Sequence, residues 1–227
     1  MSKTSTTPAS IRFRKVADAI WEAQHAHPFV RGIGDGTLDA GRFGIWLRQD
    51  YLYLIDYARL FGAAVMRAPD LEAMTRFAEL LRGIMVTEMD LHRSYVAGFG
   101  ITEADLLAET KVPTNQGYTD FLLRTATTGD YAELLGALLP CLWGYNEIGL
   151  RLAERGLPED ERYRAWIDMY ASEEFTRLAT WGRELTDAAC EGLPEPALRR
   201  AEHAFITSSR WELAFWEMAW TREKWLA

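Results

Sequence analysis

LLPCLWGYNEIG, residues 138–149, is the stretch around which the rest of the chain is organised. Its apolar spacing is that of a helix, yet it contains a proline. Pro140 cannot donate a backbone hydrogen bond and clashes with the carbonyl one turn earlier, so we expect the helix to bend or loosen there. Cys141 lies at that turn, and Tyr145, four residues on, shares its helical face. We interpret Cys141 as a candidate nucleophile; the alternative is a small core residue.

Length and composition bound the kind of protein. A chain of 227 residues without a proline- or glycine-rich linker predicts one domain, residues 10–227, after a short disordered tail, residues 1–9. The net charge of -8 offers no basic face for nucleic acid or an anionic membrane. No apolar run approaches the ~18 residues that span a bilayer. Two cysteines and no secretory signal predict a cytoplasmic protein with free thiols, whose partners are small ligands or proteins.

Apolar residues recur at helical spacing through most of the chain, and no period-two alternation bounded by turn residues indicates a strand. Irregular chain is expected at the glycine-rich segment 27–39 and at an acidic turn, 102–107. Asp39 and Asp130 are predicted N-caps. The fold class is therefore all-α, a single-domain helical bundle, with helices predicted over 10–25, 40–67, 70–98, 113–127, 131–154, 159–169, 172–189 and 195–224.

One face of the long helix 40–67 carries polar groups among apolar neighbours. Asp50, Tyr53 and Tyr57 lie at i, i+3 and i+7 and so point the same way. A carboxylate there is either solvated or buried, and a buried carboxylate must be paired with donors or with a ligand. Periodicity leaves both possibilities open: Asp50 receives a ligand, or it is bound by Arg48, Arg59 or a tyrosine hydroxyl.

The spacing of histidines and carboxylates does not indicate a metal centre. Helical di-iron sites take a Glu-x-x-His pair from each of two helices. This chain has a single such pair, Glu22 with His25, and a pair spaced by four, Glu88 with His92. For the two histidines we expect surface roles rather than ligation. CxxC, HExxH and the phosphate-binding glycine patterns are absent, and GIGDG at 32–36 follows no strand. We expect no metal and no nucleotide cofactor.

The remaining chemical groups come from different segments, and only the fold can unite them: Cys141, Asp50, Glu212, Tyr53, Tyr118, Tyr145 and Tyr170. Together they would suit an aminopyrimidine, because a carboxylate can bind its ring nitrogen and exocyclic amine with two hydrogen bonds while tyrosines stack on the ring. A thiolate adds to an electron-poor ring carbon more readily once a ring nitrogen is protonated. A glutamate whose pKa is raised by burial can supply that proton, and a leaving group then departs.

Four blocks, in order along residues 10–225, resemble the thiaminase II (TenA) family of aminopyrimidine aminohydrolases: HPFVRGIGDGTL, FGIWLRQDYLYLIDYAR, LLPCLWGYNEIG and SSRWELAFWEMAW. The resemblance implies a haem-oxygenase-like fold, a homotetramer and no metal or organic cofactor. It also implies hydrolysis of 4-amino-5-aminomethyl-2-methylpyrimidine to the hydroxymethyl compound and ammonia, a step of thiamin salvage, with slower hydrolysis of thiamin.

The resemblance further implies roles for individual residues. Cys141 corresponds to the nucleophile, and Glu212 to the acid/base that protonates the ring and manages the leaving amine. Asp50 corresponds to the carboxylate that binds the amidine edge, and the residues around the ring are Tyr53, Tyr118, Tyr145, Tyr170 and Phe215. Cys190 matches no block, so we expect it to be structural or exposed.

Two other classes of function remain open. One is a non-catalytic pyrimidine-binding or regulatory protein, which would have the same pocket but no need of the Cys141 thiol. The other is a redox enzyme on the same fold, either metal-dependent or acting on a quinone precursor, which stoichiometric iron or manganese would indicate. In the family resembled, some relatives lack the cysteine, so its presence here favours the hydrolase.

Overall fold

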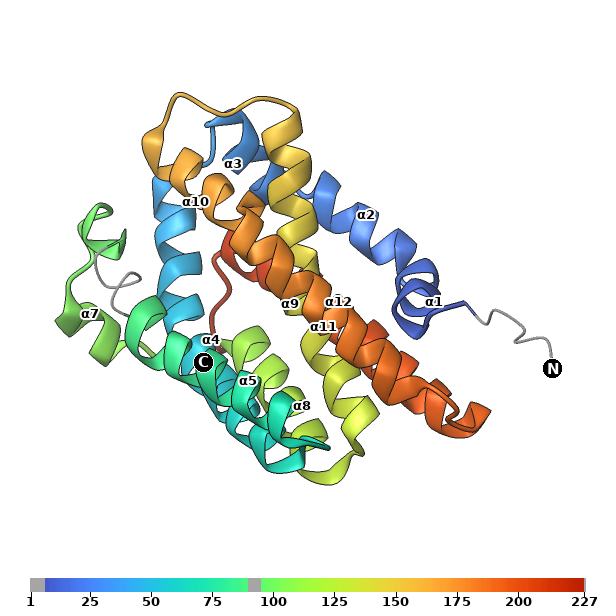
Figure 1. Cartoon of the computed structure of the whole chain (residues 1–227). Helices are drawn as coiled ribbons and strands as arrows, with labels where there is room; N and C mark the ends of the chain where they lie inside the picture. The colour runs from blue at the N-terminus through green and yellow to red at the C-terminus, as the bar shows by residue number, and fades with distance from the viewer. Residues whose placement is uncertain (1–6, 90–94, 227) are drawn as a thin grey trace.

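Helices form every regular element in the computed structural model, which describes residues 7–89 and 95–226, without the side chains at 87 and 88. The all-α prediction is confirmed for these residues (Figure 1). In chain order the elements are α1 (Ala9–Val16), α2 (Asp18–Ala26), α3 (Pro28–Asp35), α4 (Ala40–Arg67), α5 (Leu71–Arg82), the π-helix η1 (Gly83–Glu88), α7 (Glu103–Ala108), α8 (Pro113–Thr128), α9 (Tyr131–Glu154), α10 (Glu161–Ala171), α11 (Glu173–Cys190) and α12 (Glu195–Thr221).

Helix α9, which contains residues 138–149, is the central element. It packs against α12, α11, α10 and α8, and α12 and α8 also contact α4 (Figure 1). One large apolar core fills the space between these helices. A second, smaller core joins α1 and α2 to α9 and α12, and it buries Cys190, which therefore has a structural environment. Both cysteines are free thiols.

Local sequence explains where α9 begins and how closely its neighbours approach. Asp130 and Glu133 form a capping box, in which each side chain accepts the other residue's backbone N–H, at 2.9 and 2.8 Å. The helix then continues through Pro140 to Glu154 without interruption. A Cβ atom at Gly136 would lie 2.4 Å from the carbonyl oxygen of Ala201, so this glycine allows the backbones of α9 and α12 to touch. The thiol is thus held on a continuous helix that packs closely against α12.

Several predicted boundaries were wrong, each for a local reason. The helix predicted over 10–25 divides at Ala17 into α1 and α2. The segment 27–39 contains α3, because His27 caps the Phe29 N–H, proline occupies the first turn, and Gly36 ends the helix in the left-handed conformation at φ 70°. The acidic turn 102–107 is α7, begun by a capping box.

The helix predicted over 70–98 is regular only as α5, after which the backbone forms η1. His92 and the side chain of Glu88 lie outside the described residues, as do residues 1–6 of the predicted tail. Helix α1 begins at Ala9, inside that predicted tail.

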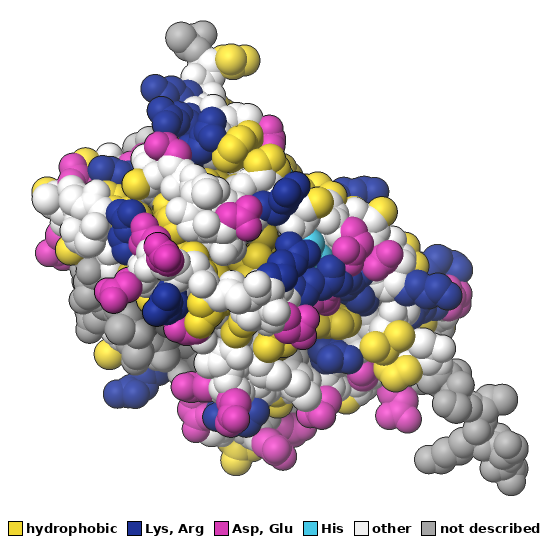
Figure 2. Space-filling model, turned by 90° about the horizontal axis from the view of Figure 1, so that it is seen from above, with side chains coloured by type: hydrophobic (Ala, Val, Ile, Leu, Met, Phe, Trp, Pro, Cys, Tyr) yellow, Lys and Arg dark blue, Asp and Glu magenta, His cyan; other side chains and the backbone are white. Residues whose placement is uncertain are grey.

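Among the described helices, none combines the length and apolarity needed to cross a bilayer. Seen from above, basic and acidic side chains are interspersed over the surface (Figure 2).

Candidate active site

Cys141 of α9 and Glu212 of α12 lie side by side, within hydrogen-bonding reach of each other. Their contact follows from the close packing of the two helices along their length. Glu212 is 2 % exposed, whereas Cys141 is only half-buried. Sequence alone could not establish this proximity, which brings a thiol and a carboxyl from two helices into one location.

The Glu212 carboxyl is connected to a chain of hydroxyl groups. The Tyr118 hydroxyl, from α8, lies 2.6 Å from Glu212 Oε1 and 2.9 Å from Ser208 Oγ. Ser208, one turn before Glu212 on α12, donates a hydrogen bond to the carbonyl oxygen of Ala137 on α9 at 2.7 Å. Tyr118 and Ser208 are both 0 % exposed. The chain therefore ties the carboxyl to three helices.

Two further hydroxyls, those of Tyr53 and Tyr57 on α4, lie beside the Cys141 thiol. Their rings stack at 5.3 Å, and Tyr53 also contacts Tyr118 at 5.2 Å and Phe215 at 5.7 Å. Both hydroxyls are buried, and neither has a well-aligned hydrogen-bond partner among the described residues. Buried polar groups without partners are costly, so these hydroxyls are suited to a ligand or to a charged sulfur.

Burial shifts the pKa of both central groups upward. It raises the pKa of Glu212 to about 7, although the Tyr118 hydroxyl and the Cys141 thiol act in the opposite direction. It also raises the pKa of the Cys141 thiol well above its ordinary value, and the charge of Glu212 adds to this effect while Tyr53 and Tyr57 oppose it. Glu212 thus titrates near neutrality, and the thiol is protonated in the resting site.

Asp50 lies half-buried on α4 in the same region, and its charge contributes to the raised pKa of the α9 thiol. Of the two arginines considered as its partners, Arg48 lies 3.6 Å from Glu109, and Arg59 forms an ion pair with Asp56. Asp50 is therefore close enough to the thiol for its charge to act on it.

Tyr145 and Tyr170 pack against each other next to this region. Their rings are 4.9 Å apart, and Tyr145 also packs 5.1 Å from Trp216. The charges of Glu212 and Asp50 both contribute to a raised pKa of Tyr145, after burial, which is the larger cause. The eight residues singled out from the sequence therefore lie in one part of the molecule.

Tyr57 and Ser208 were not among those eight. Tyr57 lies at i+7 from Asp50 on the same face of α4, and this spacing alone could have included it. Ser208 lies at i−4 from Glu212, but serine at such a position is common in helices, and its contact with the Ala137 carbonyl depends on how α9 and α12 pack.

A second polar cluster, of Glu22, His25 and Glu147, has metal-ligand atoms within 4.8 Å of one another. Arg14 and Arg151 lie 2.9 and 2.8 Å from Glu147, and Arg151 also lies 2.8 Å from Glu22. These arginines neutralise the carboxylates, so we interpret the cluster as an ion-pair network. The expected surface role is wrong for His25, which is 7 % exposed.

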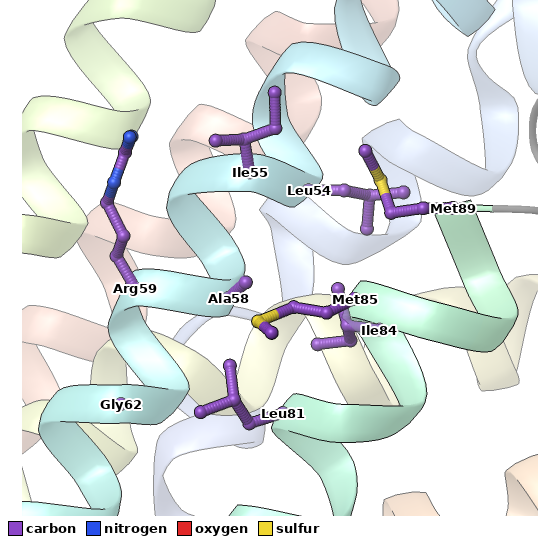
Figure 3. A pocket seen from close by; sticks show the side chains of 9 residues that line it. All are labelled: Leu54, Ile55, Ala58, Arg59, Gly62, Leu81, Ile84, Met85 and Met89. Carbon is purple, nitrogen blue, oxygen red and sulfur yellow. The ribbon is translucent and has the colours of Figure 1, made fainter.

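A groove of about 440 Å³ lies between α4 on one side and α5 and η1 on the other (Figure 3). Among the described residues Arg59 is the one charged side chain in its lining, and neither Cys141 nor Glu212 belongs to it. The groove is therefore separate in composition from the candidate active site. Its lining residues are Leu54, Ile55, Ala58, Arg59, Gly62, Leu81, Ile84, Met85 and Met89.

The helix arrangement defines a protein class. A protein from Shewanella denitrificans described as having a heme oxygenase-like fold superimposes with a TM-score of 0.74 over 93 % of this chain and 92 % of its own, at 14 % identity, which establishes the fold alone. The profile of the TENA/THI-4/PQQC family matches residues 14–222, and the chain belongs to this family.

Closer relatives agree with that assignment. The aminopyrimidine aminohydrolase of Halalkalibacterium halodurans is 42 % identical over 212 residues, which cover 92 % of this chain and 94 % of that protein. A TenA homologue from P. horikoshii OT3 has a TM-score of 0.88 at 31 % identity, over 95 % of this chain and 99 % of its own.

Proposed function

We propose that this chain is an aminopyrimidine aminohydrolase of thiamin salvage. It would convert 4-amino-5-aminomethyl-2-methylpyrimidine and water to 4-amino-5-hydroxymethyl-2-methylpyrimidine and ammonia, and hydrolyse thiamin more slowly. The observation that carries the proposal is the Cys141 thiol beside a glutamate whose pKa is about 7, within a ring of tyrosines. Family membership, and the activity for which the 42 % identical relative is named, support it.

The catalytic roles follow from the two pKa values. Glu212, as the acid, protonates a pyrimidine ring nitrogen, and its carboxylate then takes the proton of the Cys141 thiol. The thiolate adds to the activated ring carbon and forms a C–S bond, aided by the Tyr53 and Tyr57 hydroxyls beside the sulfur. At this stage Glu212 is again an acid and the ring is electron-rich.

The second half of the reaction uses the same proton carrier. Glu212 protonates the amine, which leaves as ammonia as its C–N bond breaks. Water adds to the exocyclic carbon and returns a proton to Glu212, forming the hydroxymethyl group. The C–S bond then breaks, and the ring nitrogen proton returns to the sulfur through Glu212. Atoms and protons balance, and the protein ends in its starting state.

Substrate binding is assigned to groups around the sulfur. Asp50 accepts a hydrogen bond from the exocyclic amine and, once the adjacent ring nitrogen carries a proton, a second from that nitrogen, a two-point contact that suits an amidine-like edge. The ring lies among Tyr53, Tyr118, Tyr145, Tyr170 and Phe215. The hydroxyls of Tyr53 and Tyr57, which lack a well-aligned partner among the described residues, support a polar ligand in this position.

We further propose that the protein acts as a cytoplasmic homotetramer without a metal or organic cofactor, and that residues 10–227 form its single domain. The continuity of the main core from α3 to α12 supports one domain. Sedimentation of the purified protein tests the oligomeric state, and metal analysis tests the absence of a metal. A monomer, or stoichiometric iron or manganese, would contradict them, and the metal would favour the redox alternative.

The decisive experiment follows ammonia release from the aminomethylpyrimidine. Wild type should turn over, whereas Cys141→Ser should lose activity by orders of magnitude while remaining folded. Cys190→Ala is the matched control, because it removes the other free thiol from a different core and should retain turnover. Pyrimidine binding without turnover in the wild type would instead indicate a regulatory or binding protein.

A further inference from the structure

Three oxygen–oxygen contacts form a line from α9 to the catalytic carboxyl. Ser208 Oγ lies 2.7 Å from the Ala137 carbonyl oxygen, and the Tyr118 hydroxyl lies 2.9 Å from Ser208 Oγ. The same hydroxyl lies 2.6 Å from Glu212 Oε1. All three distances fall in the normal range for O–H···O hydrogen bonds, so each contact needs one hydrogen.

Counting hydrogens determines the direction of each bond. A carbonyl oxygen only accepts, so Ser208 must use its single hydrogen on Ala137. Ser208 can then only accept from Tyr118, which in turn uses its single hydrogen there. The contact at 2.6 Å still needs a hydrogen, and the remaining group that can supply one is the carboxyl of Glu212, in its protonated form.

An ionised Glu212 breaks this pattern. Tyr118 would then donate to the carboxylate, and the lone pairs of Tyr118 and Ser208 would face each other at 2.9 Å. Because both residues are 0 % exposed, solvent cannot easily relieve that contact. The protonated carboxyl satisfies all three contacts at once.

The other groups facing Glu212 do not favour the carboxylate by charge. Tyr53, Tyr57 and Asp50 come from α4, and Cys141 and Tyr145 come from α9. None of these five side chains is a cation, and Asp50 is an acid. Burial raises the pKa of Glu212 to about 7 even against the opposing effect of the Tyr118 hydroxyl, and that opposing effect is absent when Tyr118 donates to Ser208 instead.

We propose that Ser208 is a positioning residue that keeps Glu212 protonated: it donates its own hydrogen to the Ala137 carbonyl and so draws the Tyr118 hydroxyl hydrogen to its oxygen, away from the carboxyl. Ser208 touches no reacting atom in this role. It sets the resting state of the acid that the proposed function requires for the first proton transfer, and its kinetic consequences rest on that function.

The test compares two neighbouring buried serines. In Ser208→Ala, Tyr118 is free to donate to the carboxylate, so Glu212 should lose its proton about one pH unit lower, a tenfold change in its ionisation ratio. Ser209→Ala is the matched control, because Ser209 accepts from Trp21 Nε1 at 2.9 Å and is not connected to Tyr118. It should leave the titration of Glu212 unchanged.

The readout is the infrared carbonyl band of the protonated carboxyl, assigned by its loss in Glu212→Gln and followed between pH 5 and pH 9 without substrate. Tyr118→Phe removes the hydroxyl entirely, so the band should then titrate no lower than in wild type, opposite to Ser208→Ala. A wild type without the band at pH 5 to 6, or equal titration in Ser208→Ala and Ser209→Ala, overturns the proposal.

The kinetic arm uses the pH dependence of ammonia release. The basic limb of the turnover profile should move to lower pH in Ser208→Ala, in step with the infrared titration, and stay in place in Ser209→Ala. A basic limb that does not follow the infrared shift would contradict the role in catalysis. A wild type without turnover would refute the proposed function, while the infrared titration still decides the role of Ser208.

Discussion

Glu212 and Glu147, on the neighbouring helices α12 and α9, respond oppositely to the protein interior. Burial raises the pKa of Glu212 to about 7, since its partners are uncharged. Burial also acts to raise the pKa of Glu147, but the hydrogen bond from His25 and the pairing with Arg14 outweigh it and bring the pKa to about 2. The charge of the partner, rather than burial itself, thus separates a proton donor from a permanent anion.

Variants of Glu212 and Glu147 should differ most in the rate of turnover. Glu212→Gln should lower the rate of ammonia release by about 10²–10⁴-fold, because the amide cannot carry a proton to the ring. Glu147→Gln should change the rate by no more than about threefold, since it alters an ion pair away from the thiol. Steady-state rates at saturating substrate measure both, and similar losses in the two variants would show that the clusters are not functionally separate.

The second difference concerns stability at neutral pH. The pKa of Glu212 rises from an ordinary 4.5 to about 7 on folding, so the folded state binds more protons between these values. The contribution of Glu212 to the free energy of unfolding is therefore fully present below pH 4.5 and is lost as pH rises through 7. The change amounts to about 3 kcal/mol. Urea midpoints at pH 5 and pH 8 should differ more in wild type than in Glu212→Gln. Equal pH dependence in the two proteins would contradict this assignment.

Glu147 should show the reverse dependence in acid. Its pKa falls from 4.5 to about 2 on folding, so its contribution is present above pH 4.5 and is lost as pH falls toward 2. We expect this contribution to the free energy of unfolding to be about 2 kcal/mol. It is less than the full pKa shift implies, because the Glu147 side chain is 19 % exposed and solvent screens it. Urea unfolding of wild type and Glu147→Gln at pH 7 and pH 3 measures it. The difference between the two proteins at pH 7 should fall to about two-fifths at pH 3, and an undiminished difference there would count against the ion pairs.

The long helices were predictable from sequence because their signals are local. Asp39 and Asp130 cap α4 and α9 as predicted, each accepting a backbone N–H three residues on. Helices α3 and α7 were missed because glycines and acidic residues also mark loops. The cap that His27 supplies to α3 and the capping box at Thr102 were not recognised. Short helices depend on such individual contacts more than on periodicity.

For the candidate site, the four sequence blocks that resemble the family supplied the candidate residues, but not their positions relative to one another. That Cys141 and Glu212 touch is a property of how α9 and α12 pack, which no spacing within either helix contains. Ser208 is the clearer case. Its function depends on the carbonyl of Ala137, a backbone atom whose availability no side-chain pattern reports.

The smallest predicted effect tests how far an uncharged partner can stabilise an anion. The Tyr57 hydroxyl lies beside the Cys141 thiol and lowers its pKa, against burial and the charge of Glu212, which raise it. Tyr57→Phe should therefore raise the thiol pKa further and slow its alkylation by iodoacetamide about three- to tenfold at pH 8. The Cys190→Ala background confines the reaction to one thiol.

Tyr131→Phe is the matched control for this measurement, because Tyr131 also has a buried hydroxyl without a partner among the described residues. The thiol is not among the causes of the raised pKa of Tyr131, which are burial and the charge of Asp70. Equal alkylation rates in the Tyr57 and Tyr131 variants would mean that the phenol does not stabilise the thiolate. A slower rate in Tyr57→Phe alone would extend the contrast between Glu212 and Glu147 to sulfur: neutral donors moderate the effect of burial on the pKa, whereas the cationic partners of Glu147 reverse it.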